Sequence, residues 1–142
     1  MKVIVVGCGR VGSRVSRQLD RAGWDVTVID ENEESLHRLG EDWRGGFVVG
    51  HGMETQVLLE AGIEDADAMV VATNGDNTNL VVGQVAQKRF GVGTVIVRVL
   101  DPARAELYAT LGLRTVSPTS TAITVLIDAV LACAPRAEKA TA

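Results

Sequence analysis

The chain begins with Lys2-Val-Ile-Val-Val-Gly7-Cys8-Gly9-Arg10-Val11-Gly12, in which a short apolar run leads directly into the spacing G-x-G-x-x-G. Apolar residues at helical spacing follow this stretch, and a second apolar run, Val26-Thr-Val-Ile29, ends in Asp30. A strand, a glycine turn, a helix and an acidic residue at the end of the next strand are together typical of a dinucleotide-binding βαβ unit. We therefore expect a nucleotide site at the start of the chain.

Each glycine of this turn has an expected role. Gly7 makes the tight turn, Gly9 lets the backbone approach a pyrophosphate, and Gly12 lets the following helix pack closely on the strand. The helix predicted over Arg10–Ala22, with Val11 in its first turn, presents its N-terminal N–H groups and its dipole to the phosphates. The alternative is a glycine turn with a structural role only, because glycines also serve turns and caps.

The composition indicates one α/β domain. The 142 residues suffice for about one domain, and 46% of them are hydrophobic whereas only 4% are aromatic. A core of Val, Ile, Leu and Ala is typical of parallel strands covered on both faces. The formal net charge is −4 and the basic residues are scattered singly along the chain, so no nucleic-acid partner is expected.

The sequence predicts no membrane segment and no export signal. The apolar run before Gly7 is too short for the apolar region of a signal peptide. The longest apolar stretch, Ala122 to Ala134, is interrupted by Asp128 and is shorter than the ~20 residues that span a bilayer. Cys8 and Cys133 belong to no zinc or redox motif, so no metal is expected. We expect a cytoplasmic protein without direct membrane insertion.

Apolar runs of strand length alternate with helical patterns along the chain. The predicted strands are Val3–Val6, Asp25–Ile29, Gly46–Val49, Ala68–Ala72, Thr94–Val99 and Arg114–Val116. The predicted helices are Arg10–Ala22, Asn32–Leu39, Thr55–Ala61, Asn77–Phe90, Pro102–Leu111 and Thr119–Cys133. This alternation predicts a Rossmann-like, doubly wound parallel sheet of six strands in the order 3-2-1-4-5-6. We divide the chain into a nucleotide-binding domain (1–117), a C-terminal interface helix (118–134) and a flexible tail (135–142).

Candidate ligand-binding residues follow the strands, because ligands of such sheets lie across the carboxyl ends of the strands. The candidates are Gly7, Gly9, Arg10, Val11, Gly12, Asp30, Glu31, Gly50, His51, Ala72, Thr73, Asn74, Asn77 and Arg98.

Asp30 is the candidate for the ribose. Its carboxylate can accept hydrogen bonds from both ribose hydroxyls of an adenosine, and its charge would repel a 2′-phosphate. The residue therefore favours NAD, ADP or ATP over NADP. The alternative is that Asp30 caps the helix predicted to start near Asn32, and the two roles can coexist.

Two arginines are candidates for the phosphates. Arg10 would project from the first helical turn toward the phosphate region, and a solvated surface arginine is the alternative. Arg98 interrupts an apolar strand, and a buried arginine must be paired or bind an anion. Either it reaches the phosphates, or it pairs with an acid such as Asp76 or Asp101.

Polar residues after the third and fourth strands have two interpretations. His51 can border the adenine, or it can be a loop histidine without a chemical role. A general base is less attractive, because the sequence alone places no nucleophile or orienting carboxylate beside it. Thr73, Asn74 and Asn77 can contact a ribose or a nicotinamide-side group, or can serve as N-caps of the next helix.

The sequence resembles the N-lobe of the regulator-of-potassium-conductance (RCK) family, the TrkA-type nucleotide-binding domain of bacterial potassium uptake and channel systems. The resemblance extends from Met1 to about Val130. Its specific motifs are Gly7-Cys-Gly-Arg10-Val-Gly12, Val28-Ile-Asp30, the segment Ala72-Thr73-Asn74 to Asn79-Leu80, Val95-Ile-Val-Arg98-Val with Asp101-Pro102, and Ala105-Glu-Leu-Tyr108 through Leu111-Gly-Leu to Val116-Ser-Pro118.

The resemblance implies a cytosolic domain, peripheral to the inner membrane, that binds NAD(H) or ADP/ATP. Its occupancy would bias a membrane-embedded potassium transporter or channel subunit, with no enzymatic activity of its own. The resemblance also places Arg10 and Arg98 near the phosphates and implies a homodimer or higher ring, formed partly through Thr119–Cys133. One departure is Gly50-His51, where the family usually has Gly-Asp.

The sequence leaves two other functions open. The first is the cofactor-binding half of an NAD-dependent oxidoreductase, but no substrate domain with an acid or base follows Val116. A short-chain enzyme would need a Lys four residues after a Tyr, whereas Tyr108 is followed by Gly112 at that spacing. The second is a dimerisation module that holds nucleotide as a structural ligand.

Overall fold

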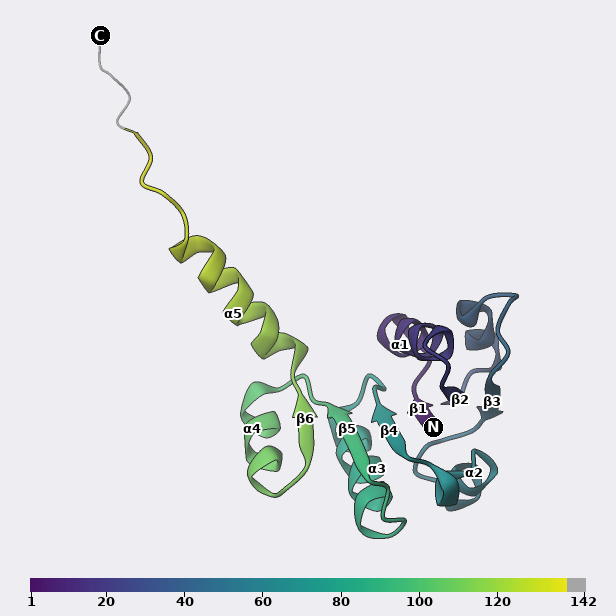
Figure 1. The fold of residues 1–142 in the computed structure, drawn as a ribbon. Helices are drawn as coiled ribbons and strands as arrows, with labels where there is room; N and C mark the ends of the chain where they lie inside the picture. Colours follow the sequence, from purple (N-terminus) through teal and green to yellow (C-terminus); the bar gives the residue numbers. More distant parts are fainter. Residues whose placement is uncertain (138–142) are drawn as a thin grey trace.

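A computed structural model of the chain describes residues 1–137 and contains a parallel sheet of six strands (Figure 1). The strands are β1 (Lys2–Val6), β2 (Asp25–Asp30), β3 (Gly46–Val49), β4 (Ala68–Val71), β5 (Thr94–Arg98) and β6 (Arg114–Val116). Every neighbouring pair is parallel, and the order is β3-β2-β1-β4-β5-β6. The predicted Rossmann-like sheet and its strand order are confirmed.

The helices largely follow the predicted pattern. They are α1 (Arg10–Arg21), α2 (Thr55–Glu60), α3 (Asp76–Lys88), α4 (Pro102–Thr110) and α5 (Pro118–Leu131), with 3₁₀ helices η1 (Glu33–Leu39) and η2 (Ile63–Asp65). The segment predicted as a helix over Asn32–Leu39 has 3₁₀ geometry, since the N–H of Ser35 donates to the carbonyl of Asn32 three residues back. The short helix η2 was not predicted.

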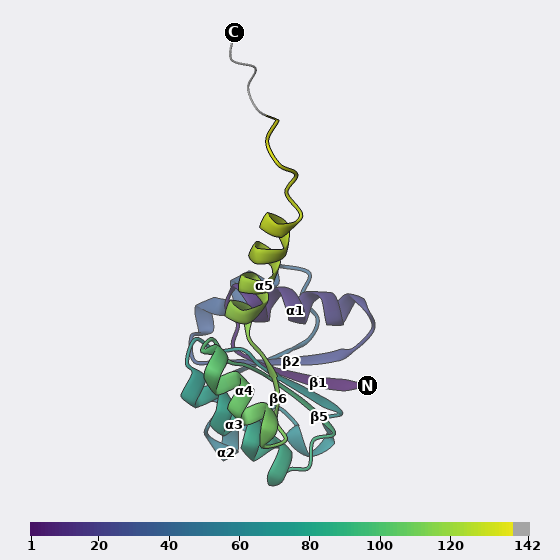
Figure 2. The ribbon, with the colours of Figure 1, turned by 90° about the vertical axis from the view of Figure 1, so that its left-hand side faces the viewer.

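Apolar residues cover both faces of the sheet. Along β1, Val3 and Val5 belong to a core cluster with Leu39, whereas Ile4 and Val6 belong to a larger cluster on the other face. Helix α1 lies on one side of the strands, and α2, α3 and α4 lie on the other (Figure 2). Because both faces are buried, the strands are nearly continuously apolar, as expected for parallel strands in an α/β domain.

The register of the central strands brings their carboxyl ends together. Val6 at the end of β1 pairs with Ile29 of β2 and Val71 of β4. The N–H of Gly7 donates to the carbonyl of Ile29, at 2.8 Å, and the N–H of Ala72 donates to the carbonyl of Val6, at 2.8 Å. The turns that follow β1, β2 and β4 are therefore neighbours at one edge of the sheet.

The glycine turn has the predicted geometry at two positions. Gly7 has a φ of 100°, a conformation that favours glycine, and a Cβ there would lie 2.7 Å from the carbonyl oxygen of Ala72. A Cβ on Gly12 would lie 1.8 Å from the carbonyl oxygen of Gly7. The turn and the packing of α1 on β1 therefore require glycine at both places.

Helix α5 follows the sheet and projects away from it (Figures 1 and 2). Ser117 caps its N-terminus by accepting from the N–H of Ser120, and none of its residues is buried. Its large exposed apolar side chains are Ile123, Val125, Leu126, Ile127, Val130 and Leu131. The division of the chain at residues 117 and 134 stays a prediction, and residues 138–142 of the predicted tail lie outside the described part.

Within residues 1–137, no helix combines the length and the apolar character needed to cross a bilayer.

Candidate functional site

A cleft of about 410 Å³ opens at the carboxyl edge of the sheet, between the turns that follow β1, β2, β3 and β4. The candidate residues that line it are Gly7, Gly9, Asp30, Glu31, Gly50, His51, Ala72, Thr73 and Asn74. The remaining lining residues are Val6, Ile29, Asn32, Ser35, Arg38, Gly52, Gly75 and Thr78. The structure therefore brings together candidates from four separate turns of the chain.

Five candidates lie outside the cleft lining, and they are Arg10, Val11, Gly12, Asn77 and Arg98. Arg10 and Val11 are exposed at the start of α1, and Gly12 is buried against the turn. Asn77, on α3, accepts a hydrogen bond from the guanidinium of Arg104. These placements separate residues that can face a ligand from residues that shape or flank the turn.

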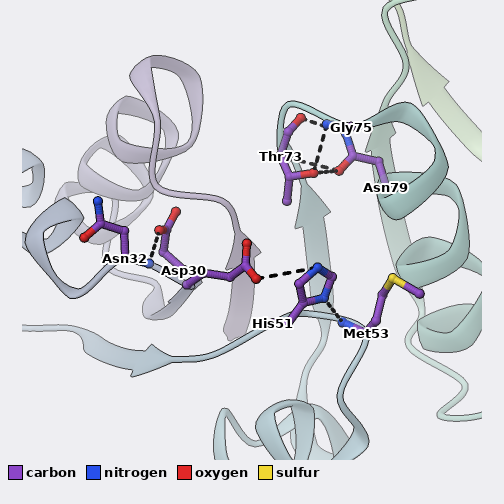
Figure 3. Close-up of polar contacts among 8 residues, drawn as sticks. Asp30, Asn32, His51, Met53, Thr73, Gly75 and Asn79 are labelled. Atoms are coloured by element: carbon purple, nitrogen blue, oxygen red, sulfur yellow. Dashed lines mark hydrogen bonds and ion pairs between the residues drawn. The ribbon is translucent and has the colours of Figure 1, made fainter.

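Asp30 links the glycine turn to the segment after β2. One carboxylate oxygen accepts from the N–H of Cys8, at 2.7 Å. The other accepts from the N–H of Asn32, at 2.8 Å (Figure 3), and from the hydroxyl of Ser35, at 3.2 Å. Asn32, not Asp30, is the N-cap of η1. Asp30 thus supports the start of η1 and lines the cleft at the same time.

Cys8 adds a second link between the turn and η1. Its thiol is buried and donates to the carbonyl of Ser35, with Sγ and O 3.3 Å apart. Burial raises the pKa of the Cys8 thiol to about 11; the nearby carboxylate of Asp30 adds to the rise, and Arg38 opposes it. Cys8 is therefore a neutral packing residue at physiological pH.

The raised pKa and the burial of Cys8 predict that it reacts more slowly with alkylating reagents than exposed Cys133. At pH 9 about 1% of Cys8 would be thiolate, because its pKa lies about two units higher. Its sulfur is also buried, whereas Cys133 is exposed to the reagent. We expect alkylation of Cys8 at pH 9, measured in Cys133→Ser, to be at least about 50-fold slower than alkylation of Cys133 in Cys8→Ser. Equal rates would contradict the burial of Cys8, and unfolding in urea should remove the difference.

Arg38 is the charged cleft residue that the sequence interpretation missed. It lies in the last turn of η1, lines the cleft, and donates from Nη1 to the carbonyl of Cys8, at 3.1 Å. In a 3₁₀ helix residues three apart share a face, so Arg38 lies on the same side as Ser35, which bonds Asp30. The three-residue spacing of Ser35 and Arg38, shortly after Asp30, is the sequence feature that could have placed Arg38 at the cleft.

His51 is held at the cleft by its own turn. Its Nδ1 accepts from the N–H of Met53, at 3.1 Å (Figure 3). Its Nε2 lies 3.8 Å from a carboxylate oxygen of Glu31. With Nδ1 accepting, the ring proton resides on Nε2, which leaves a donor at the cleft beside an exposed carboxylate.

Asn79 organises the turn after β4. Its side-chain oxygen accepts from the N–H of Thr73, at 3.1 Å, and from the Thr73 hydroxyl (Figure 3). Its amide donates to the carbonyls of Thr73 and Arg98. Asn79 is buried, so these bonds fix the turn from inside. The N-cap of α3 is Gly75, without a side-chain capping bond, so capping by Thr73, Asn74 or Asn77 is not found.

Arg98 supports the same turn and does not pair with an acid. Its Nη2 donates to the carbonyl of Thr73, at 2.6 Å, and to the side-chain oxygen of Asn74, at 3.3 Å. The carboxylate of Asp76 instead accepts from the N–H groups of Leu100 and Asp101. The carboxylate of Asp101 accepts from the N–H groups of Ala103 and Arg104. The predicted alternative of an Arg98 ion pair with Asp76 or Asp101 is therefore wrong, because both carboxylates are bound to backbone donors.

The parallel sheet, the glycine turn at its carboxyl edge and the cleft beside Asp30 define a Rossmann-like domain, and in sheets of this kind dinucleotides bind at this edge. The chain belongs to the TrkA-N domain family, whose model matches residues 3–118.

Relatives and solved structures agree with this assignment. The chain is 44% identical over 117 residues to the Trk system potassium uptake protein TrkA of Streptomyces coelicolor; this match covers 82% of the chain and 52% of that protein. It resembles the AMP-bound Kef C-terminal domain of Shewanella denitrificans, with 25% identity, a TM-score of 0.77, and coverage of 92% of this chain and 80% of that one. It also resembles the GsuK RCK domain, with 25% identity and a TM-score of 0.75; this match covers 88% of this chain and 27% of the GsuK chain. The chain thus spans about half the length of its Streptomyces relative.

Proposed function

We propose that the chain is a regulatory nucleotide-binding domain of a potassium transport system. It binds an adenine nucleotide, NAD(H) or ADP/ATP, in the cleft, and its occupancy biases a membrane-embedded potassium transporter or channel subunit. The observation that carries the proposal is the cleft itself, which joins the glycine turn to the carboxylate of Asp30. The Streptomyces relative is named for potassium uptake, and the Kef domain is described in an AMP-bound form.

The residues present fit an adenine nucleotide. The cleft, at about 410 Å³, lies within the usual range of small-molecule sites. Among residues 1–137, a Cβ on Gly9 would meet only the Arg38 guanidinium, at 3.9 Å, so the backbone there is open to a phosphate. Helix α1 has no side-chain cap and no acidic residue in its first turn, which leaves its N-terminal N–H groups for an anion. Asp30 lies beside them, where a ribose would follow.

The proposal assigns no covalent chemistry to the cleft. The Nδ1 atom of His51 accepts from the N–H of Met53, so it is not free to take a proton from a substrate. The role of the nucleotide is then to favour one of two states of an assembly, which requires different affinities for the two states.

Helix α5 is the proposed interface for that assembly. Its apolar side chains are exposed in the single chain, with Leu126 and Leu131 at 66% and 77% exposure. Such a surface favours pairing with a second copy in a homodimer or higher ring, and we propose the segment 118–134 as the interface helix. The domain would then lie at the cytoplasmic side of the inner membrane through its transporter partner.

Calorimetric titration with NAD, NADH, NADPH, ADP and ATP, combined with light scattering of each complex, tests the proposal. We expect binding of NAD(H) or of ADP/ATP, weaker binding of NADPH, and a change in assembly or in affinity for the membrane partner. Binding that changes neither would favour a structural ligand, and turnover of an aldehyde or 2-hydroxy acid would favour an oxidoreductase. Absence of binding would contradict the proposal.

A further inference from the structure

The cleft has an uneven distribution of charge. Among the described residues that line it, Asp30 and Glu31 carry negative charge and Arg38 supplies the guanidinium, whereas Arg10 and Arg98 lie outside the lining. A nucleotide phosphate that enters beside two carboxylates gains most from the cation that faces it. Arg38 is therefore the arginine whose charge acts directly in the cleft.

The position of Arg38 places this charge on the glycine turn. Its Nη1 donates to the carbonyl of Cys8, and the same guanidinium lies 3.9 Å from the Cβ position of Gly9, the N-cap of α1. The free N–H groups of the first turn of α1 begin at this point. An anion bound there meets backbone donors on one side and the guanidinium on the other.

Arg38 also has donors left for a ligand. A guanidinium carries five N–H donors, and one hydrogen bond, to Cys8, is made within residues 1–137. Within residues 1–137 no carboxylate lies within ion-pair distance of Arg38; the contact between His51 Nε2 and Glu31, at 3.8 Å, does not involve it. The side chain is exposed, so its remaining donors reach the cleft without moving the core.

We propose that Arg38 binds a phosphate group of the nucleotide and determines how much that phosphate contributes to affinity. This inference rests on the proposed function, because it concerns the same cleft. The 5′-phosphate lies nearest the glycine turn in a site of this kind, and a 2′-phosphate on the ribose is the other source of the same chemistry. A planar guanidinium can bind either group through two parallel hydrogen bonds.

The test compares adenosine, 5′-AMP and 2′-AMP binding to wild type, Arg38→Ala and Arg38→Lys, with nucleoside affinity measured by NMR titration at millimolar concentration. We expect Arg38→Ala to weaken 5′-AMP binding about 10–100-fold and adenosine binding less than about threefold. Arg38→Lys should recover part of the lost 5′-AMP affinity, since lysine keeps the positive charge but lacks the paired donors of the planar guanidinium. A loss confined to 2′-AMP would assign the contact to the 2′-phosphate instead.

The matched control is Arg14→Ala, which removes the same charge from an exposed position of α1 that does not line the cleft. It should leave all three affinities within about twofold of wild type. Equal weakening of adenosine and 5′-AMP by Arg38→Ala would overturn the inference, because it would mean that Arg38 only holds the glycine turn. If wild type binds none of the three ligands, the proposed function fails and the inference fails with it.

Discussion

Gly12→Ala should reduce the free energy of unfolding by about 4 kcal/mol or more, the largest loss expected from a single added methyl group in this domain. The Cβ would lie 1.8 Å from the carbonyl oxygen of Gly7 and 2.9 Å from its carbonyl carbon. Both atoms belong to the backbone of the tight turn, so no flexible side chain can move aside. Helix α1 would have to leave β1, and urea denaturation followed by circular dichroism would measure the loss.

Gly93→Ala is the matched control for this substitution. The nearest atom to a Cβ on Gly93 is the carbonyl oxygen of Asp67, at an ordinary contact distance of 3.6 Å, and Gly93 has no left-handed φ. Its effect should stay within about 1 kcal/mol of wild type. If the two variants were equally stable, the close packing of α1 on the glycine turn would be contradicted.

The sheet could be predicted because its signals are local and agree with one another. In β1, Val3 and Val5 face one core cluster while Ile4 and Val6 face the other, so the strand is apolar throughout, as buried parallel strands are. The glycine turn after it then fixes the first βαβ unit, and the right-handed crossover rule limits how later strands can be added. The strand order follows from these constraints.

The polar interior of the site could be predicted only in part, because its contacts join distant positions. Arg38 bonds the carbonyl of Cys8, thirty residues earlier in the chain, and its direction depends on 3₁₀ winding that the sequence pattern predicts as an ordinary helix. Asn79 similarly bonds the carbonyl of Arg98 across two elements. The type of a residue shows that it needs a partner, but only the fold decides which partner it meets.

Arg98 shows the same limit for charged residues. A charge within an apolar strand correctly predicted a need for partners. It did not predict that the partners are the carbonyl of Thr73 and the side chain of Asn74, both in the turn after β4. Of the two acids predicted as alternative partners, Asp76 accepts from the N–H groups of Leu100 and Asp101, and Asp101 accepts from the N–H groups of Ala103 and Arg104.

Asp30→Ala should affect both stability and binding. The substitution leaves three donors without their acceptor, namely the N–H groups of Cys8 and Asn32 and the hydroxyl of Ser35. Because the site is partly open to water, we expect a loss of about 2–3 kcal/mol in the free energy of unfolding, measured by urea denaturation. Glu33→Ala, which removes an exposed carboxylate from the first turn of η1, should change stability by less than about 1 kcal/mol.

The effect of Asp30→Ala on binding can separate its two roles. If the carboxylate also accepts from the ribose, wild type should bind 5′-AMP more tightly than 2′-deoxy-5′-AMP, and Asp30→Ala should weaken 5′-AMP by about 10–100-fold and abolish most of that preference. If Asp30 only holds Cys8 and Asn32, the variant should weaken both ligands by the same factor and keep their ratio. Calorimetric titration of both ligands against wild type and Asp30→Ala measures how far the substitution changes the ratio of the two affinities. A retained preference in the variant would refute the ribose contact, even where the overall affinity has fallen.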